Sequence, residues 1–218
     1  MDSGRHARDQ KPRAADAASS AIRLSEHSGV FRRVYWLERD QLRRHLLRLS
    51  PDDRQLRFGA SVSDRFITDY CARRDWRRDS VLGCWIDGEL RAVAELKPID
   101  HAWFGEAEVS LSVEAPWQNH DIGTELLRRL AIIARNRLIT SLYLICLPRN
   151  AKLMHLLRKL DAEFAFGVSE AEARLVLGSP TQLTIMLELL DETSSMLGGL
   201  ASEAHPLPAV SSARSEGS

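Results

Sequence analysis

A short polar turn holds the residues best suited to bind an anionic ligand. The turn and the first helical positions after it are Gln118, Asn119, His120, Asp121, Ile122, Gly123 and Thr124. Because the first backbone N–H groups of a helix have no partner within it, such a terminus binds anions. Gly123 also lets a phosphate approach the backbone without meeting a side chain. The turn therefore predicts a phosphate site, although a plain turn with Asp121 at the helix start fits the same residues.

Two glutamates on neighbouring predicted strands are the candidates for acid–base chemistry. Glu108 lies on the polar face of the strand before the turn, and Glu95 lies in the strand before that. If the connection closes near His101 and Ala102, the two carboxylates are opposite each other, which raises one of their pKa values. Such a carboxylate could act as a general base. A solvent-facing position is the alternative for either residue, and we expect Glu106 to lie on the surface.

A strand before the turn and a helix after it must position these groups. In the strand, an apolar face alternates with a polar face of two glutamates, Glu106 and Glu108, and two serines, a period of two that is typical of a half-buried strand. The apolar face comprises Ala107, Val109, Leu111 and Val113, and the polar face comprises Glu106, Glu108, Ser110 and Ser112. From Ile122 onward the spacing is helical. The buried stripe comprises Leu126, Leu127, Leu130, Ile133, Ala134 and Leu138.

The remaining pattern predicts an α/β fold with a mixed, mostly antiparallel sheet flanked by helices. Asp87 and Gly88 favour positive φ and predict a hairpin turn. The apolar run at 141–147 favours a central strand buried on both faces, parallel to the strand at 106–113. Ligands of such sheets bind beyond the carboxyl ends of the strands. The other expected strands are 30–36, 80–86, 90–96, 164–166, 174–177 and 182–189, and the other expected helices begin near Glu38, Ser50, Ser63 and Ala151.

The stretch WQNHDIGTELLRRL, residues 117–130, resembles the acetyl-CoA signature of the GNAT acetyltransferases. That signature has Gln or Arg, two variable residues, a glycine, one variable residue, and glycine or alanine; Gln118, Ile122 and Gly123 match. Asp121 replaces the first glycine, beside the position where the family holds a pyrophosphate, and His120 stands where a basic residue is common. A carboxylate roughly 4 to 6 Å from a pyrophosphate weakens binding by about 1 to 4 kcal/mol, whereas Asp is favourable at a helix N-terminus.

Two further segments carry the resemblance. LPRNAKLMHLLRKLDAEF, residues 147–164, is similar to a later family segment, in which Asn150 opens a helix. A glycine expected near Asp161 is absent, and Leu157 replaces the tyrosine that protonates the leaving thiolate in many members. LSPDDRQLRF, residues 49–58, is similar to the substrate-side region of GNAT proteins related to bacterial protein-lysine acetyltransferases.

The resemblance implies that an amine attacks the thioester of acetyl-CoA directly, with Glu108, or its rival Glu95, as the general base. No side chain stands out as the acid for the thiolate; Tyr143, Cys146 and His155 are weak candidates, and water can serve. Asn150 is either a contact to the pantetheine arm or a helix cap. The implied contacts to acetyl-CoA are Leu111, Ser112, Val113, Gln118, Asn119, His120, Asp121, Ile122, Gly123, Thr124 and Asn150.

Composition narrows the class of protein. The 218 residues include 30 basic and 30 acidic side chains, and the dispersed arginine pairs indicate solvated faces rather than a nucleic-acid groove. Three separated cysteines argue against disulfides and thiolate metal sites, so we expect a cytoplasmic protein without bound metal. No apolar run reaches membrane-spanning length. We expect one domain over 21–190, with disordered tails at 1–20 and 191–218.

Three hypotheses follow. The first is an N-acetyltransferase that moves an acetyl group from acetyl-CoA to an amine, a protein lysine ahead of a small amine, as a monomer or homodimer. The second is a weak or inactive GNAT-like module that binds acyl-CoA or a protein partner, for which Asp121 and Leu157 are the reasons. The third is an interaction domain that binds no CoA. The acceptor and the preferred acyl chain stay open.

Overall fold

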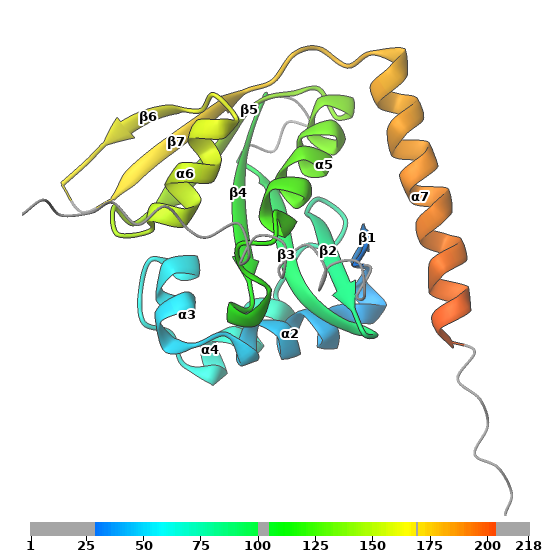
Figure 1. The fold of residues 1–218 in the computed structure, drawn as a ribbon, viewed down its shortest axis with the longest axis horizontal. Coiled ribbons are helices and arrows are strands. Elements are labelled where there is room, and N and C mark those ends of the chain that lie inside the picture. Colours follow the sequence, from blue (N-terminus) through cyan, green and yellow to red (C-terminus); the bar gives the residue numbers. More distant parts are fainter. Residues whose placement is uncertain (1–28, 100–104, 169, 204–218) are drawn as a thin grey trace, which may run out of the picture.

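A sheet of seven strands forms the centre of the molecule (Figure 1). The computed structural model describes residues 29–99, 105–168 and 170–203. The strand order is β1-β2-β3-β4-β5-β7-β6, and every neighbouring pair is antiparallel except β4 and β5. The predicted α/β fold with a mixed, mostly antiparallel sheet is confirmed. The strands are β1 (Val30–Arg33), β2 (Ser80–Ile86), β3 (Glu89–Pro98), β4 (Gly105–Val113), β5 (Ile139–Cys146), β6 (Glu163–Phe166) and β7 (Ala171–Val176).

Helices cover both faces of the sheet (Figure 1). On one face lie α2 (Arg39–Arg48), α3 (Pro51–Phe58) and α4 (Asp64–Ala72), and on the other lie α5 (Ile122–Asn136) and α6 (Ala151–Lys159). The first face buries Val81 and Val93, and the second buries Leu82, Ala94 and Leu96. Because successive side chains of a strand point to opposite faces, the same strands supply both cores. Two short 3-10 helices, η1 (Trp36–Glu38) and η2 (Ala115–Trp117), connect elements.

Local signals in the sequence set several element boundaries. Ser50 caps α3 and Ser63 caps α4, each accepting the backbone N–H three residues on, at 3.1 and 3.2 Å. Asp87 and Gly88 have φ values of 54° and 74° and form the predicted hairpin between β2 and β3. β1 ends at Arg33 rather than at residue 36, because the next residues turn into η1.

The register between β3 and β4 differs from the expected one. Glu95 pairs with Ser110, and Glu108 pairs with Lys97, so the two glutamates share a face without being opposite each other. A relative slip of two residues leaves every side chain on its original face, so the alternation of apolar and polar residues cannot detect it. Residues 101 and 102, where the connection was expected to close, lie outside the described residues.

The second face of β5 is buried only near its start, where Ser141 is 2% exposed, so the expectation of a strand buried on both faces fails toward its carboxyl end. Leu142, Leu144 and Cys146 are buried in the core beneath α5 and α6, but Ile145 is 54% exposed. In the described part of the chain, the helices of the other face pack over β2, β3 and β4, which leaves that face of β5 and β7 open (Figure 1).

The last expected strand, residues 182–189, was also wrong, because it begins α7 (Gln182–Glu203). Leu, Met, Glu and Gln dominate this stretch, and all favour helix. Thr181 and Thr184 cap it reciprocally: Thr181 Oγ1 accepts the Thr184 N–H at 3.2 Å, and Thr184 Oγ1 accepts the Thr181 N–H at 2.9 Å. α7 lies along α5 and β1 (Figure 1).

The ends of two predicted segments also change. α7 continues to Glu203, so the first part of the expected tail at 191–218 is helical. Residues 1–20 and 204–218 lie outside the described residues, and the division into one domain and two tails stays a prediction. Leu138, expected in the buried stripe of α5, lies beyond the end of that helix and is exposed.

Candidate functional site

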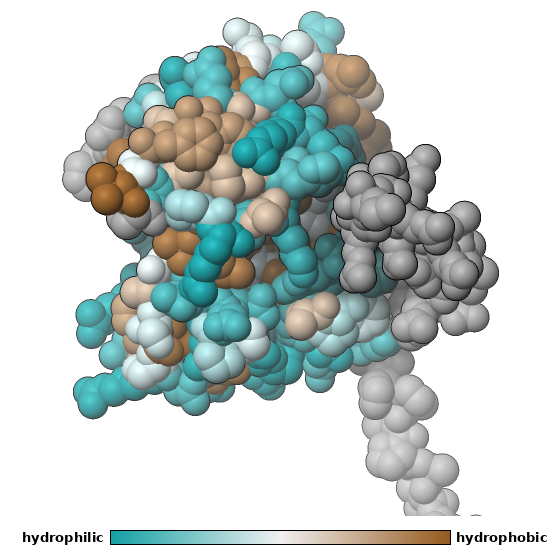
Figure 2. Space-filling view, turned by 60° about the vertical axis from the view of Figure 1, so that its left-hand side comes forward, coloured by the Kyte–Doolittle hydropathy of each residue, from teal (hydrophilic) through white to brown (hydrophobic). Residues whose placement is uncertain are grey.

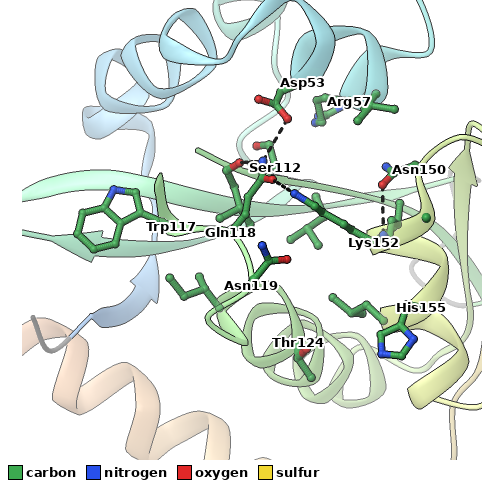
Figure 3. Close-up of a pocket in the computed structure, with 18 of the residues that line it drawn as sticks. Asp53, Arg57, Ser112, Trp117, Gln118, Asn119, Thr124, Asn150, Lys152 and His155 are labelled. Carbon is green, nitrogen blue, oxygen red and sulfur yellow. Dashed lines mark hydrogen bonds between the residues drawn. The ribbon is translucent and has the colours of Figure 1, made fainter. Parts of the chain in front are cut away.

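β4 and β5 are parallel neighbours that separate before they end. Their pairing runs from Gly105 with Ile139 to Glu108 with Tyr143, whereas β4 continues to Val113 and β5 to Cys146. The two strands therefore diverge toward their carboxyl ends, which is where open sheets bind ligands. A cleft of about 830 Å³ lies at this divergence (Figure 3).

The cleft brings together four parts of the chain: α3, the end of β4, the turn with the start of α5, and α6 with the loop before it. His120 is the one predicted acetyl-CoA contact that does not line it; this residue lines a neighbouring cavity of about 210 Å³ together with Phe31 and Cys84. The predicted contacts that do line the cleft are Leu111, Ser112, Val113, Gln118, Asn119, Asp121, Ile122, Gly123, Thr124 and Asn150.

α5 presents its first backbone N–H groups to the cleft. The Glu125 N–H donates to the Asp121 carbonyl at 3.0 Å, so the N–H groups of the residues between them have no acceptor within the helix. The helix dipole adds partial positive charge at this end. A Cβ on Gly123 would lie 3.1 Å from Leu111 and 3.3 Å from Leu156, so glycine allows α5 to pack closely against β4 and α6.

The turn before α5 contains two residues in the left-handed region. Asn119 has φ 64° and Asp121 has φ 55°. Asn and Asp tolerate this conformation better than other residues with side chains, so Asp121 replaces the family's glycine while keeping the path of the turn. Its side chain is exposed and makes no capping hydrogen bond to α5. A negative charge therefore stands at the rim of the cleft.

Gln118 joins two sides of the cleft (Figure 3). Its Nε2 donates to Asp53 Oδ1 of α3 at 3.1 Å and to the Val113 carbonyl at 3.0 Å, and its Oε1 accepts from Lys152 Nζ of α6 at 2.7 Å. A ligand that fills the cleft must share or replace these bonds. Asp53 and Lys152 were not predicted as site residues.

The free edge of β4 also faces the cleft. The Glu114 N–H donates to the Arg91 carbonyl of β3 at 3.1 Å, so Val113 and Leu111, which alternate with it, direct their N–H groups away from β3. β5 is the strand on that side, and its recorded pairing with β4 stops at Glu108. Two backbone donors thus point into the cleft beyond the last strand pair.

α6 contributes a basic face that the sequence analysis missed. Lys152, His155 and Lys159 line the cleft at the spacing of one helix face, and Arg149 lies in the loop before them. The leucine spacing in this segment predicted a helix, but nothing local placed that helix beside the turn at 118–121. Asn150 caps α6, since its Oδ1 accepts the Leu153 N–H at 3.2 Å.

Glu95 is held in a buried ion-pair cluster. Its side chain is 2% exposed and contacts the guanidinium groups of Arg57 and Arg74, while the Tyr70 hydroxyl donates to its Oε2 at 2.8 Å. Burial alone would raise the pKa of the Glu95 carboxyl, but the two arginines outweigh it and lower the pKa to about 2. So low a pKa disfavours a role as general base at neutral pH. Arg74, expected on a solvated face, is buried.

Glu108 has a different setting, because it is exposed on the face of β4 that looks toward the uncovered side of β5. Its neighbours across the sheet are Lys97 on β3 and Tyr143 on β5. Solvent therefore reaches this carboxylate directly. Neither predicted base lines the cleft, and of the two only Glu108 is exposed.

The three residues predicted as candidates to protonate the leaving thiolate lie in different parts of the fold. Tyr143 donates its hydroxyl to Glu106 Oε1 at 2.8 Å, which raises the pKa of the phenol, and Cys146 is buried with its thiol against the Ala171 carbonyl. Of the three predicted candidates, only His155 lines the cleft. Leu157, in the place of the family's tyrosine, is fully buried.

The family model for the GNAT acetyltransferases matches residues 31–162, which include every part of the cleft described above. The chain belongs to this family. No curated protein sequence matches it.

Solved GNAT structures share the fold. The GNAT domain of S. lividans PAT is 20% identical with a TM-score of 0.60, and the match covers 69% of this chain and 97% of that one. A putative acetyltransferase of Salmonella typhimurium, yncA, solved with acetyl-CoA, is 15% identical with a TM-score of 0.53, over 71% of this chain and 96% of that one. The PaiA N-acetyltransferase of Thermoplasma acidophilum, solved with coenzyme A, is 16% identical with a TM-score of 0.52, over 68% and 99%.

Three further features bear on the expectations that composition raised about metal ions, membranes and disulfides. Across residues 29–99, 105–168 and 170–203, no group of three or more His, Cys, Asp or Glu side chains is arranged to hold a metal ion. Within the same residues, no helix has both the length and the apolar character needed to cross a membrane. Cys71, Cys84 and Cys146 are buried and form no disulfide.

Proposed function

We propose that this protein transfers an acetyl group from acetyl-CoA to an amine. The main support for this proposal is that the N-terminus of α5, the free edge of β4 and the basic face of α6 meet in one cleft. The family supports acetyl-CoA-dependent transfer in general. The identity of the amine and the roles of single residues belong to the proposal.

The residues of the cleft suit the parts of acetyl-CoA. The N–H groups at the start of α5 suit the pyrophosphate, and Lys152 and Lys159 add positive charge along the same cleft. The N–H groups of Leu111 and Val113 suit the amide groups of the pantetheine arm, which would extend the sheet at the free edge of β4. Acetyl-CoA supplies a thioester whose thiolate is a good leaving group.

The negative charge of Asp121 weakens acetyl-CoA binding, but the positive charges at the cleft outweigh it. Its carboxylate is exposed, so a contact with a phosphate at about 4 Å costs about 1 kcal/mol in water-like surroundings. The helix dipole contributes a comparable amount in the opposite direction, and Lys152 adds a full positive charge in the same cleft. We therefore expect acetyl-CoA to bind despite the missing glycine.

Glu108 is our candidate for the general base of direct attack. An ammonium group must lose a proton before its nitrogen can attack a carbonyl carbon. Glu108 is exposed on the face of the sheet that the helices leave open over β5 and β7, so an amine approaching from that side meets its carboxylate.

The uncovered face of β5 and β7 also affects which kind of amine can be the acceptor. It carries Tyr143, Ile145, Arg174 and Val176 on neighbouring strands, with Ile145 and Val176 exposed. Figure 2 shows the molecule after its β6 side has been turned forward, and most of the surface in that view is hydrophilic, with hydrophobic residues among it. The open face of β5 and β7 suits the lysine of a folded protein better than a small amine, which would be bound in an enclosed pocket. We therefore rank a protein lysine ahead of a small amine.

Release of the CoA thiol from acetyl-CoA, in the presence of lysine-containing proteins or of small amines, tests this proposal. The expected result is thiol release that depends on an added acceptor and falls about 10²-fold or more in Glu108→Gln. Ser110→Ala, on the same face of β4, is the matched control and should keep full activity. Acetyl-CoA binding without release of the CoA thiol in the presence of any amine would favour the second candidate, a GNAT module that senses acyl-CoA. Asp121 and the buried Leu157 are the observations that favour this candidate.

A further inference from the structure

The helix α7 turns polar side chains toward the body of the protein. Thr184, Glu188 and Glu192 follow one another at four-residue intervals and therefore share one face of the helix. Glu188 accepts hydrogen bonds from Arg33 Nη2 of β1 at 2.8 Å and from Asn136 Nδ2 of α5 at 2.7 Å. Thr184 Oγ1 donates to Asn136 Oδ1 at 2.9 Å. Polar contacts therefore attach this part of α7 to α5 and β1.

The other sides of the same helix are apolar and exposed. From Gln182 to Leu190, only Thr184 and Glu188 are not exposed. The apolar residues of this stretch, which we call the α7 ridge, are 41–65% exposed and comprise Leu183, Ile185, Met186, Leu187, Leu189 and Leu190. Single exposed apolar side chains are common, but a contiguous apolar patch marks an interaction site. Since a surface helix normally buries its apolar stripe, this reversed arrangement indicates a face that another surface covers.

A groove beside the α7 ridge makes the surface complementary to itself. The groove has a volume of about 280 Å³, and it lies between Ile132 and Ile133 of α5 and Leu187 and Leu190 of α7, with Glu188 also lining it. The ridge of one molecule can therefore pack into the groove of another, as side chains of one helix fill the spaces between those of its neighbour. Twofold symmetry repeats the same contact for the second molecule.

The charges around the groove favour a second copy of this chain as the occupant. Arg128 and Arg129 of α5 line the groove, and Arg128 is 55% exposed although it pairs with Glu125. α7 has no Lys or Arg, and its acidic residues are Glu188, Asp191, Glu192 and Glu203. The α7 of a second copy therefore brings acidic residues to a groove that carries arginines. Helices that lie on membranes are rich in Lys and Arg, so the charge of α7 disfavours a lipid surface.

We propose that the α7 ridge is the interface of a homodimer, in which the α7 helices of two copies pack against each other and into each other's grooves. α7 lies at the edge of the molecule away from α6 (Figure 1). None of the described residues that line the groove lines the acetyl-CoA cleft. Each copy therefore keeps its own cleft accessible, and the interface does not depend on the proposed function.

Sedimentation velocity of the full chain across the micromolar range tests the interface. We expect a species of twice the chain mass of 24.6 kDa, and a monomer in the double variant Met186→Lys/Leu190→Lys, because like charges then meet across the interface. Ile145→Lys changes an apolar side chain of similar exposure on the sheet and is the matched control that should stay dimeric. Arg128→Glu should weaken the dimer about tenfold. A monomeric parent chain, or a double variant that stays dimeric, overturns the proposal.

A cross-link tests the same interface without a destabilising charge. The native cysteines are buried, so a short bismaleimide should react with the exposed thiol that Met186→Cys places in the middle of the ridge. We expect a cross-linked dimer from Met186→Cys and none from Ile145→Cys, and equal cross-linking of the two would refute the interface. Vesicles of phosphatidylcholine and phosphatidylglycerol test the other occupant: a monomeric parent chain that sediments with them would identify lipid as the cover of the ridge and refute the homodimer.

Discussion

Replacing each of the two predicted bases with glutamine should give opposite results. Glu95→Gln should lower the stability and keep the activity, whereas Glu108→Gln should keep the stability and lower the activity. Glu95→Gln removes the carboxylate that Arg57 and Arg74 share in the core, so Arg57 loses its carboxylate partner and Arg74 keeps only Asp79, at 3.4 Å. Breaking a buried ion pair from one side costs about 3 to 5 kcal/mol. Glu108→Gln changes an exposed side chain, for which the expected change in stability is within about 0.5 kcal/mol.

The lowered pKa of Glu95 points to a cost of the same order. It is lowered from 4.5 to about 2, and this difference corresponds to about 3 kcal/mol of stabilisation. Because the pKa of the folded state is the lower one, the stabilisation is complete above pH 4.5 and is lost as the pH falls through about 2. The stability difference between the parent chain and Glu95→Gln should therefore shrink across that pH window.

Urea unfolding at pH 7 measures the stability, and release of the CoA thiol measures the activity. Glu95→Gln should unfold at a clearly lower urea concentration, while its folded fraction keeps activity; Glu108→Gln should keep its midpoint and lose activity. A Glu95→Gln protein that is as stable as the parent but inactive would refute the assignment of Glu95 to the core. A fully active Glu108→Gln protein would refute direct attack with Glu108 as the base.

Three further predictions concern the turn, the basic face and a helix cap. Asp121→Gly removes a charge at the rim of the cleft and should tighten acetyl-CoA binding about fivefold, equivalent to about 1 kcal/mol; an unchanged dissociation constant in calorimetry would mean that the carboxylate points away from the phosphates. Lys152→Ala should weaken acetyl-CoA binding about three- to tenfold in low salt, with a smaller effect at high ionic strength because exposed charges are screened; equal loss at both salt concentrations would contradict a charge effect. Ser63→Ala removes the cap of α4 and should lower the free energy of unfolding by about 1 kcal/mol, with no effect on acetyl-CoA binding.

The parts of the site that local pattern encodes could be predicted. Alternation along 106–113 and helical spacing from Ile122 placed the strand, the turn and the helix, and the capping residues Ser50 and Ser63 placed two helix starts. These features depend on neighbours within a few residues, so the sequence contains the full information for them.

The parts that depend on distant contacts could not be predicted. His45 meets Glu114 across 69 positions, and Arg57 meets Glu95 across 38. No periodicity within one element shows that an arginine on a helix will be buried against a particular strand. The register of β3 and β4 was missed for a related reason, because a slip of two residues preserves the apolar pattern.

The helix at 182–203 was missed although its signals were present. Thr181 follows a proline and is followed three residues later by Thr184, a pattern that marks a helix start. The apolar residues that come next match a strand or a helix over a short window, and residue propensity favours helix.

Titration of acetyl-CoA into the full chain by isothermal calorimetry tests whether the cleft binds acetyl-CoA. We expect saturable binding with a micromolar dissociation constant and one site per chain, with tighter binding in Asp121→Gly. Binding only in Asp121→Gly would mean that the cleft is an acetyl-CoA site disabled by its carboxylate. No binding in either protein up to millimolar acetyl-CoA would contradict the assignment of the cleft.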